Sequence, residues 1–461
     1  MCCAGGALAA PDASSVTFSE REIRTILRLS PLPPVPPDPT NALADDPRAA
    51  RLGQLLFFDR RLSANGRVAC ATCHDPARGF ADGRRVARGI APVRRHAPSL
   101  LNTAYQRWYF WDGRADSLWA QAVQPLEHPR EHGTDRLHIA HTLHDDPVLA
   151  RAYEALFGPL PALAERSRFP PHARPVESDP EHPHQRAWQA MRPEDRRAIN
   201  RVLSNVTKAI AAYERRLVRG QAPFDRFVAG LRTHDAQALG ALSASAQRGL
   251  KLFIGRARCI ACHSGPEFSD REFHNLGLPA RPWLAPDTGR AEGIRRVRND
   301  PFRATGAYSD APDSRFARKL RFLPEPGAAQ QGQFKTPTLR NVALTAPYMH
   351  GGHFASLEQV VRFYSTLRDP VDDTPIPDEA FFGRREATLR PLGLSEREVE
   401  DLTAFLRSLT GAPLDAALLR PPPAPVTRKA GRTRARTHPA HAGRAPASDH
   451  PPDHPRQERR P

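Results

Sequence analysis

Two copies of the motif Cys-x-x-Cys-His constrain this chain more than any other feature of its sequence. The motif occurs first as Cys70, Cys73 and His74, and again as Cys259, Cys262 and His263. Two thiols three residues apart can form thioethers to the two vinyl groups of one porphyrin, and the adjacent imidazole can then bind the iron. The sequence therefore predicts two covalently bound haem c groups, one for each motif.

Zinc binding and a redox-active disulfide are the other interpretations of paired cysteines. A zinc site could combine one pair with distant histidines, but that would not explain why a histidine directly follows each pair. A similar apolar segment, Gly53–Phe58 or Gly249–Ile254, precedes each motif. Because few stretches alternate with period two, this internal repeat predicts a mostly helical fold of two similar domains.

The 461 residues are enough for two or three domains. Helical periodicity predicts a helix from Pro193 to Arg219 and a closing helix capped by Ser395 and Glu398. The predicted parts are an export-signal remnant at 1–15, a first domain at 16–230 with a Pro- and His-rich surface insertion at about 157–192, a second domain at 231–411, and a disordered, basic, Pro-rich tail at 412–461.

The formal net charge of +17 is compatible with an acidic partner, a membrane surface or nucleic acid. No nucleic-acid-binding motif accompanies the charge, so we expect no nucleic-acid partner. No apolar run is long enough to span a membrane. The small, apolar N-terminus resembles the end of a truncated export signal, and covalent haem is normally attached outside the bacterial cytoplasm, so we expect a periplasmic protein. A lipid anchor on Cys2 or Cys3 is a further alternative.

Several longer segments resemble the dihaem cytochrome c peroxidase/MauG family. They are Leu56–Ser63, Pro98–Asn102, Phe110–Arg114, Lys335–Val342 and Ala346–Gly352. The resemblance covers roughly residues 20–411 and implies two cytochrome c-like domains packed about an interface. It also implies that the N-terminal haem reduces hydrogen peroxide and that the C-terminal haem relays electrons from a small donor protein, a cytochrome c or a cupredoxin.

Two alternatives remain open at this stage. The chain could oxidise side chains of a partner protein, as MauG-like members do, or it could be a non-enzymatic dihaem electron carrier. A homodimer is compatible with either activity. The resemblance places the chain nearer the MauG-like branch, because no histidine lies between His74 and Arg95 to serve as a removable ligand of the first haem. We therefore expect this haem to be five-coordinate, with His96 as the alternative ligand.

The resemblance assigns roles to three side chains around the first haem. Glu131 falls at the family's catalytic glutamate, Gln121 at a distal glutamine, and Trp111 at the tryptophan between the two haems. Such a glutamate moves a proton between the two peroxide oxygens while their bond breaks. His132 stands where methionine is common, and it is the alternative proton carrier.

The second haem and a calcium ion complete what the resemblance implies. Tyr364 falls at the sixth-ligand position of the second haem, and a phenolate there would stabilise ferric iron. Its rivals are Met349, His350 and His353. Thr345 and Pro347 keep the backbone carbonyls that bind calcium in the family, but His96 replaces an asparagine ligand, and imidazole is a poor ligand for a cation that prefers oxygen.

Overall fold

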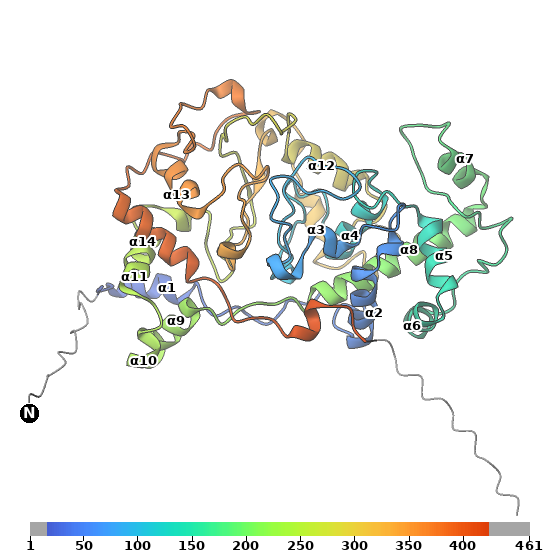
Figure 1. Ribbon diagram of the computed structural model, residues 1–461, viewed down its shortest axis with the longest axis horizontal. Helices are drawn as coiled ribbons and strands as arrows, with labels where there is room; N and C mark the ends of the chain where they lie inside the picture. Colours follow the sequence, from blue (N-terminus) through green and yellow to red (C-terminus); the bar gives the residue numbers. More distant parts are fainter. Residues whose placement is uncertain (1–15, 424–461) are drawn as a thin grey trace, which may run out of the picture. The chain divides into compact units, whose positions relative to one another are not determined.

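Helices make up nearly all of the regular structure in residues 16–423, the part of the chain that this computed structural model describes (Figure 1). This confirms the predicted mostly helical class. The predictions on residues 1–15 and on the tail after Pro423 lie outside this part. The helices are α1 (Glu20–Leu27), α2 (Pro47–Phe58), α3 (Cys70–Cys73), α4 (Leu118–Glu127), α5 (Arg136–Asp145), α6 (Pro147–Phe157), α7 (Pro183–Ala190), α8 (Pro193–Glu214), α9 (Pro223–Thr233), α10 (Ala236–Leu239), α11 (Ala244–Ile254), α12 (Arg290–Asn299), α13 (Leu357–Thr366) and α14 (Glu396–Arg407).

Two short strands, β1 (Phe273–His274) and β2 (Phe334–Lys335), form an antiparallel pair, the one sheet within residues 16–423. Short 3₁₀ helices punctuate the connections, and one of them, η4 (Cys259–Ala261), carries the start of the second motif. None of the helices described is both long and apolar enough to cross a membrane.

Two pairs of crossed helices, α2 with α8 and α11 with α14, organise the fold. Each crossing has a glycine at its closest point. A β-carbon on Gly53 would lie 1.8 Å from the carbonyl oxygen of Ala209, and one on Gly249 would lie 1.9 Å from that of Asp401. A side chain at either position would push the helices apart, so the repeat seen in the sequence becomes the same packing in both halves.

The two long helices follow the predicted signals closely. Helix α8 begins at Pro193, as predicted, and ends at Glu214, five residues before the expected end. At the start of α14, the amide of Ser395 donates to the Glu398 carboxylate at 3.0 Å, and the amide of Glu398 donates to the Ser395 hydroxyl at 3.4 Å. The predicted capping box is therefore confirmed.

Two large hydrophobic clusters surround these helix pairs. The first cluster is built mainly from α2, α4, α5 and α8, and its largest fully buried members include Phe57, Trp119 and Tyr213. The second cluster combines α9, α11 and α14, with Phe253 and Phe405 in ring contact at 5.0 Å. Each cluster adjoins one Cys-x-x-Cys-His motif, because Cys70 packs against the first and Cys259 against the second.

Each end of the described chain packs against the hydrophobic cluster of the opposite half. Helix α1 packs into the second cluster through Ile26, although it lies within the predicted first domain. Leu414 and Leu418 pack against the first cluster, and the carbonyl of Leu418 accepts a hydrogen bond from the Tyr213 hydroxyl at 2.6 Å. The prediction that the disordered tail begins at residue 412 is therefore wrong for residues 412–423, because these apolar contacts order them.

Candidate functional site

Each motif presents its histidine in the same way. Nδ1 of His74 lies 3.1 Å from the carbonyl oxygen of Phe80, and Nδ1 of His263 lies 2.8 Å from that of Phe268. When Nδ1–H donates to a carbonyl, the lone pair of Nε2 is left free to bind a metal. Burial lowers the pKa of both imidazoles, to about 4 for His74, so both stay in the neutral form that binds iron.

The two acceptor carbonyls belong to two separate turns with the same unusual backbone conformation. Phe80 and Phe268 have φ values of 57° and 54°, in the left-handed region that residues other than glycine seldom adopt. The four thiols beside these turns, Cys70, Cys73, Cys259 and Cys262, are free and half-buried. Two free thiols and one imidazole with an available Nε2 at each motif fit a covalently bound haem.

A cavity of about 610 Å³ lies beside the second motif, within the size range of cofactor pockets. Its lining includes both cysteines and the histidine of the motif and, from elsewhere in the chain, Trp111, Thr345, Pro347, Met349, His350, His353 and Tyr364. The structure thus brings together Tyr364 and its three predicted rivals in one cavity.

Tyr364 lies on α13, and its phenol is close to the second motif. Burial raises the pKa of Tyr364, and the nearby thiols of Cys259 and Cys262 add to this effect. His350 instead stacks on the ring of Phe334, with 3.6 Å between centroids and 12° between planes. The stacking engages only the face of the His350 ring, and the assignment of Tyr364 as the iron ligand stays a prediction.

The other two rivals lie in the same small apolar region as Tyr364. Met349 packs against a cluster that contains Phe354 and Phe363. His353 is buried, its Nδ1 has no hydrogen-bond partner within the described chain, and burial lowers its pKa to about 3. Both side chains therefore remain alternatives to Tyr364.

Glu131 lies beside the first motif, in the loop that follows α4. Its charge contributes to raising the pKa of the Cys73 thiol. The loop is held by backbone bonds, since the amide of Ile90 donates to the carbonyl of Glu131 at 3.0 Å. A β-carbon on Gly89 would lie 2.6 Å from the Cα of Glu131, so only glycine allows this close approach.

The environment of the Glu131 carboxyl suits a proton carrier. Burial raises its pKa, while Arg114 and Arg296 act in the opposite direction. One carboxyl oxygen lies 3.5 Å from Nδ1 of His128, whose own pKa is lowered to about 4 by burial, with Arg114 adding to the effect. No motif singles out His128, which the structure places beside Glu131.

The other two residues predicted near the first haem, Gln121 and His132, differ in their hydrogen bonds. Gln121 is half-buried on α4, and its side-chain amide has no hydrogen-bond partner in residues 16–423. His132 is buried, and its Nδ1 lies 2.9 Å from the carbonyl oxygen of Leu62. Burial also lowers the pKa of His132, which makes it a poorer proton acceptor than an exposed imidazole.

Trp111 lies between the segments that carry the two motifs. Its indole nitrogen donates to the carbonyl of His96 at 2.9 Å, and its own carbonyl accepts from the amide of Lys335 at 2.8 Å. The next residue, Asp112, is buried and pairs with Arg95 at 2.6 Å. Trp111 is therefore fixed at both its ring and its backbone, on the wall of the cavity beside the second motif.

His96 fills the region in which the resemblance places calcium. Its Nδ1 lies 2.8 Å from the carbonyl oxygen of Arg84, and its amide donates to the carbonyl of His350 at 2.8 Å. Burial lowers the pKa of His96, and hydrogen bonds to the backbone of Arg84 and Thr345 partly oppose this. Because an imidazole already bonded to these carbonyls replaces an oxygen ligand, His96, Thr345 and Pro347 do not fit a calcium ion.

The same contacts argue against His96 as a ligand of the first haem. Its Nδ1 is already bonded to the carbonyl of Arg84, and its ring lies on the wall of the cavity beside the second motif. Sequence reasoning also missed the acceptor carbonyls of Phe80 and Phe268, since nothing in the residue types announces a left-handed phenylalanine.

Comparisons with known proteins agree with these features. The family model for di-haem cytochrome c peroxidase matches residues 47–233. The chain is 34% identical to the methylamine utilization protein MauG of Methylorubrum extorquens, over 89% of this chain and 90% of that one. It is also 34% identical to the cytochrome-c peroxidase IdrP1 of Denitromonas iodatirespirans, over 83% of this chain and 86% of that one.

A similar solved structure is that of the diheme peroxidase BthA from Burkholderia thailandensis. It superimposes with a TM-score of 0.60 at 25% identity, and the match covers 82% of this chain and 90% of that one. Similarity in sequence and in fold therefore extends over both motifs and not over the first alone.

Proposed function

Because the chain belongs to the di-haem cytochrome c peroxidase family, a family with two haem cofactors, we propose that it is a periplasmic enzyme that reduces hydrogen peroxide. Peroxide would react at the haem attached to Cys70 and Cys73, and electrons would enter through the haem of the second motif. The relatives carry both peroxidase and MauG names, which supports oxidoreductase chemistry in general.

Covalently attached haem supplies the iron that binds peroxide and exchanges electrons with it. The side chains of this chain would supply the proton movements. The carboxylate of Glu131 takes the proton of the nearer peroxide oxygen and delivers it to the farther one, which leaves as water. The burial that raises the pKa of Glu131 makes it a stronger base than an exposed glutamate.

Two other side chains support this assignment. The amide of Gln121 has no partner in the described chain, so it can hydrogen-bond an oxygen ligand without breaking another contact. We assign Trp111 to the electron path between the two haems, because its ring is held by His96 of the first half and its backbone by Lys335 of the second.

The observation that carries the proposal is the partly buried Glu131 carboxyl beside the first motif. The test uses the purified holoprotein, in which pyridine haemochrome should count two haems per chain. A high-spin ferric spectrum and turnover of peroxide with a reduced small cytochrome c or cupredoxin are expected. Two low-spin haems that do not react with peroxide would instead identify a non-enzymatic electron carrier.

One observation favours a second candidate, a MauG-like enzyme that oxidises side chains of a partner protein. Tyr364, a residue typical of the MauG-like branch at this position, lines the cavity beside the second motif, close to the thiols of Cys259 and Cys262. In this case peroxide would oxidise the enzyme fully without prior reduction, and small donor proteins would not sustain turnover. Replacing Tyr364→Met should raise the reduction potential of the second haem, and an unchanged potential would rule Tyr364 out as its ligand.

A further inference from the structure

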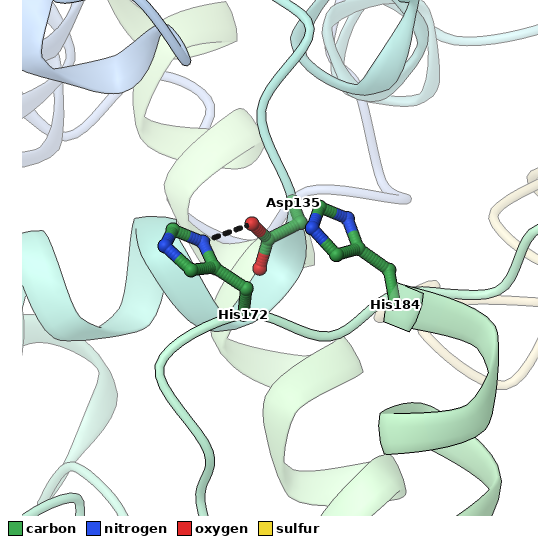
Figure 2. Close-up of side chains that lie close together, drawn as sticks. All are labelled: Asp135, His172 and His184. Carbon is green, nitrogen blue, oxygen red and sulfur yellow. Dashed lines mark hydrogen bonds and ion pairs between the residues drawn. The ribbon is translucent and has the colours of Figure 1, made fainter. Parts of the chain in front are cut away.

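The Pro- and His-rich insertion brings a cluster of histidines against helix α5, away from both haem motifs. Asp135, at the start of α5, lies between the imidazoles of His172 and His184 (Figure 2). One carboxylate oxygen and one nitrogen from each ring lie within 4.8 Å of one another. His172 belongs to the long loop of the insertion, and His184 belongs to α7. Three segments of the chain therefore meet at this point.

The two oxygens of Asp135 have different partners. Oδ1 caps α5, accepting from the amide of His138 at 3.0 Å, and also accepts from the amide of Ala173 at 2.9 Å. Oδ2 faces only Nδ1 of His172, at 2.8 Å. Oδ1 therefore fixes the position of the carboxylate, and Oδ2 is left to bind a ligand.

The imidazoles are similarly placed for a shared ligand. Nδ1 of His184 is buried and has no hydrogen-bond partner in the described chain, an arrangement that costs free energy unless something binds there. The rings of His172 and His184 are nearly parallel, with 5.7 Å between centroids and 11° between planes. The side chain of His172 is 53% exposed, while that of Asp135 is 2% exposed, so the cluster opens to solvent on one side.

From this geometry we infer that Asp135, His172 and His184 form a binding site for a divalent transition-metal ion, zinc or copper(II). Two imidazole nitrogens and one carboxylate oxygen are the donor types that these ions favour, whereas calcium and magnesium prefer oxygen alone. Ligand atoms bound at about 2.0–2.1 Å to one ion lie roughly 3 Å apart, close to the separation of His172 and Asp135. Water would complete the coordination on the exposed side.

The ion would act as a staple that holds the insertion to the body of the protein. His172 and α7 follow a long connection after α6, and a metal clip that closes a loop stabilises it by reducing the freedom of the unfolded chain. The site is separate from the haem motifs and does not rest on the proposed peroxidase activity.

The first test measures metal binding by the holoprotein after treatment with a chelator. Titration with zinc chloride and, separately, copper sulfate should show one tight site per chain, with copper(II) the tighter of the two as the general affinity order predicts. Variants His172→Ala and His184→Ala should each weaken binding by at least about tenfold, the smaller end of what loss of a supporting group costs. His144→Ala, further along α5, is the matched control and should bind as the wild type does.

The second test does not depend on any variant. X-ray absorption at the zinc or copper edge excludes the haem iron and should show imidazole nitrogens at about 2.0–2.1 Å. Metal should also protect residues 158–182 from proteolysis. Binding equal in the wild type and in both variants, or a metal spectrum without imidazole ligands, would overturn the inference. Because neither readout involves peroxide, its failure would not bear on the proposed function.

Discussion

The two Cys-x-x-Cys-His motifs hold their histidines in the same way but have different side chains nearby. On the motif side, His74 and His263 are both held through Nδ1 by a phenylalanine carbonyl from a left-handed turn. The neighbouring side chains differ, because Glu131 lies near the thiol of Cys73, whereas Tyr364 lines the cavity beside Cys259 and Cys262.

The comparison shows that the internal repeat preserves the position of the motif histidine and not the side chains around it. The repeated helix crossings and turns place the two motifs alike and determine which histidine nitrogen stays free. The side chains that distinguish the two sites come from outside the repeat, Glu131 from the loop after α4 and Tyr364 from helix α13. The predictions below test this division.

The largest expected effect comes from removing one attachment motif at a time. Replacing Cys70 and Cys73 by serine should leave one haem per chain and abolish the reaction with peroxide. Replacing Cys259 and Cys262 should also leave one haem, but the first site should still bind peroxide while donor turnover stops. Pyridine haemochrome and stopped-flow absorption measure both. If either double variant behaved like the other, the two sites would not differ in role.

The next effect concerns the acidic group of the first site. Glu131→Gln should slow cleavage of the peroxide bond by about 10²–10⁴-fold, with both haems retained. Because the pKa of Glu131 is raised, the wild-type rate should fall as the pH drops through a value above that of an ordinary glutamate, and the variant should lose this pH dependence. Glu194→Gln, at the exposed start of α8, is the matched control. A loss below roughly tenfold would assign proton transfer to His132 or water.

A third prediction concerns a buried acid next to the first motif. Glu214, in the last turn of α8, is buried, and burial raises its pKa to about 8. Since an unfolded glutamate has a pKa of about 4.3, stability should fall as the pH rises from about 4.3 to 8, because only the unfolded state releases the proton. Glu214→Gln removes this loss, so it should stabilise the protein at pH 7 by a few kcal/mol at most and have little effect at pH 4.

Thermal melts of both proteins between pH 4 and pH 8 check this prediction. Glu194→Gln should keep the wild-type pH dependence, because its side chain is exposed. Parallel curves for the wild type and Glu214→Gln would show that Glu214 ionises normally in the folded protein.

The smallest expected effect lies between the two sites. Trp111→Phe removes the hydrogen bond from the indole to His96, at a cost of about 0.5–1.5 kcal/mol in unfolding free energy. It should also slow reduction of the first haem by electrons that enter at the second, because phenylalanine is harder to oxidise. Denaturant unfolding and stopped-flow reduction measure the two effects. Unchanged electron transfer at the expected stability loss would make Trp111 a packing residue only.

The two Cys-x-x-Cys-His motifs could be recognised from the sequence because they are short and contiguous. Spacing alone identified Cys70, Cys73 and His74, and local capping rules identified the start of α14. The position of Glu131 beside the first motif depended on resemblance, since an isolated glutamate carries no local signal.

Other features depend on contacts between distant segments and could not be predicted. The crossing of α1 into the second cluster follows from burial of Ile26, which no local pattern specifies. The insertion was predicted as a surface segment, and its histidines were given no role. Only the fold shows that His172 and His184 meet Asp135, because the three residues have no regular spacing in the sequence.

The exchange of chain ends between the clusters has a consequence for the order of folding. The first cluster is completed by Leu418, which is synthesised after all other described members of that cluster, and the second cluster uses Ile26, which is synthesised among the first. The packing of each half is therefore completed by a segment that is distant in sequence. Such long-range contacts slow folding. Truncating the chain before Leu414 should therefore destabilise the first half, although the deleted residues lie far from it in sequence.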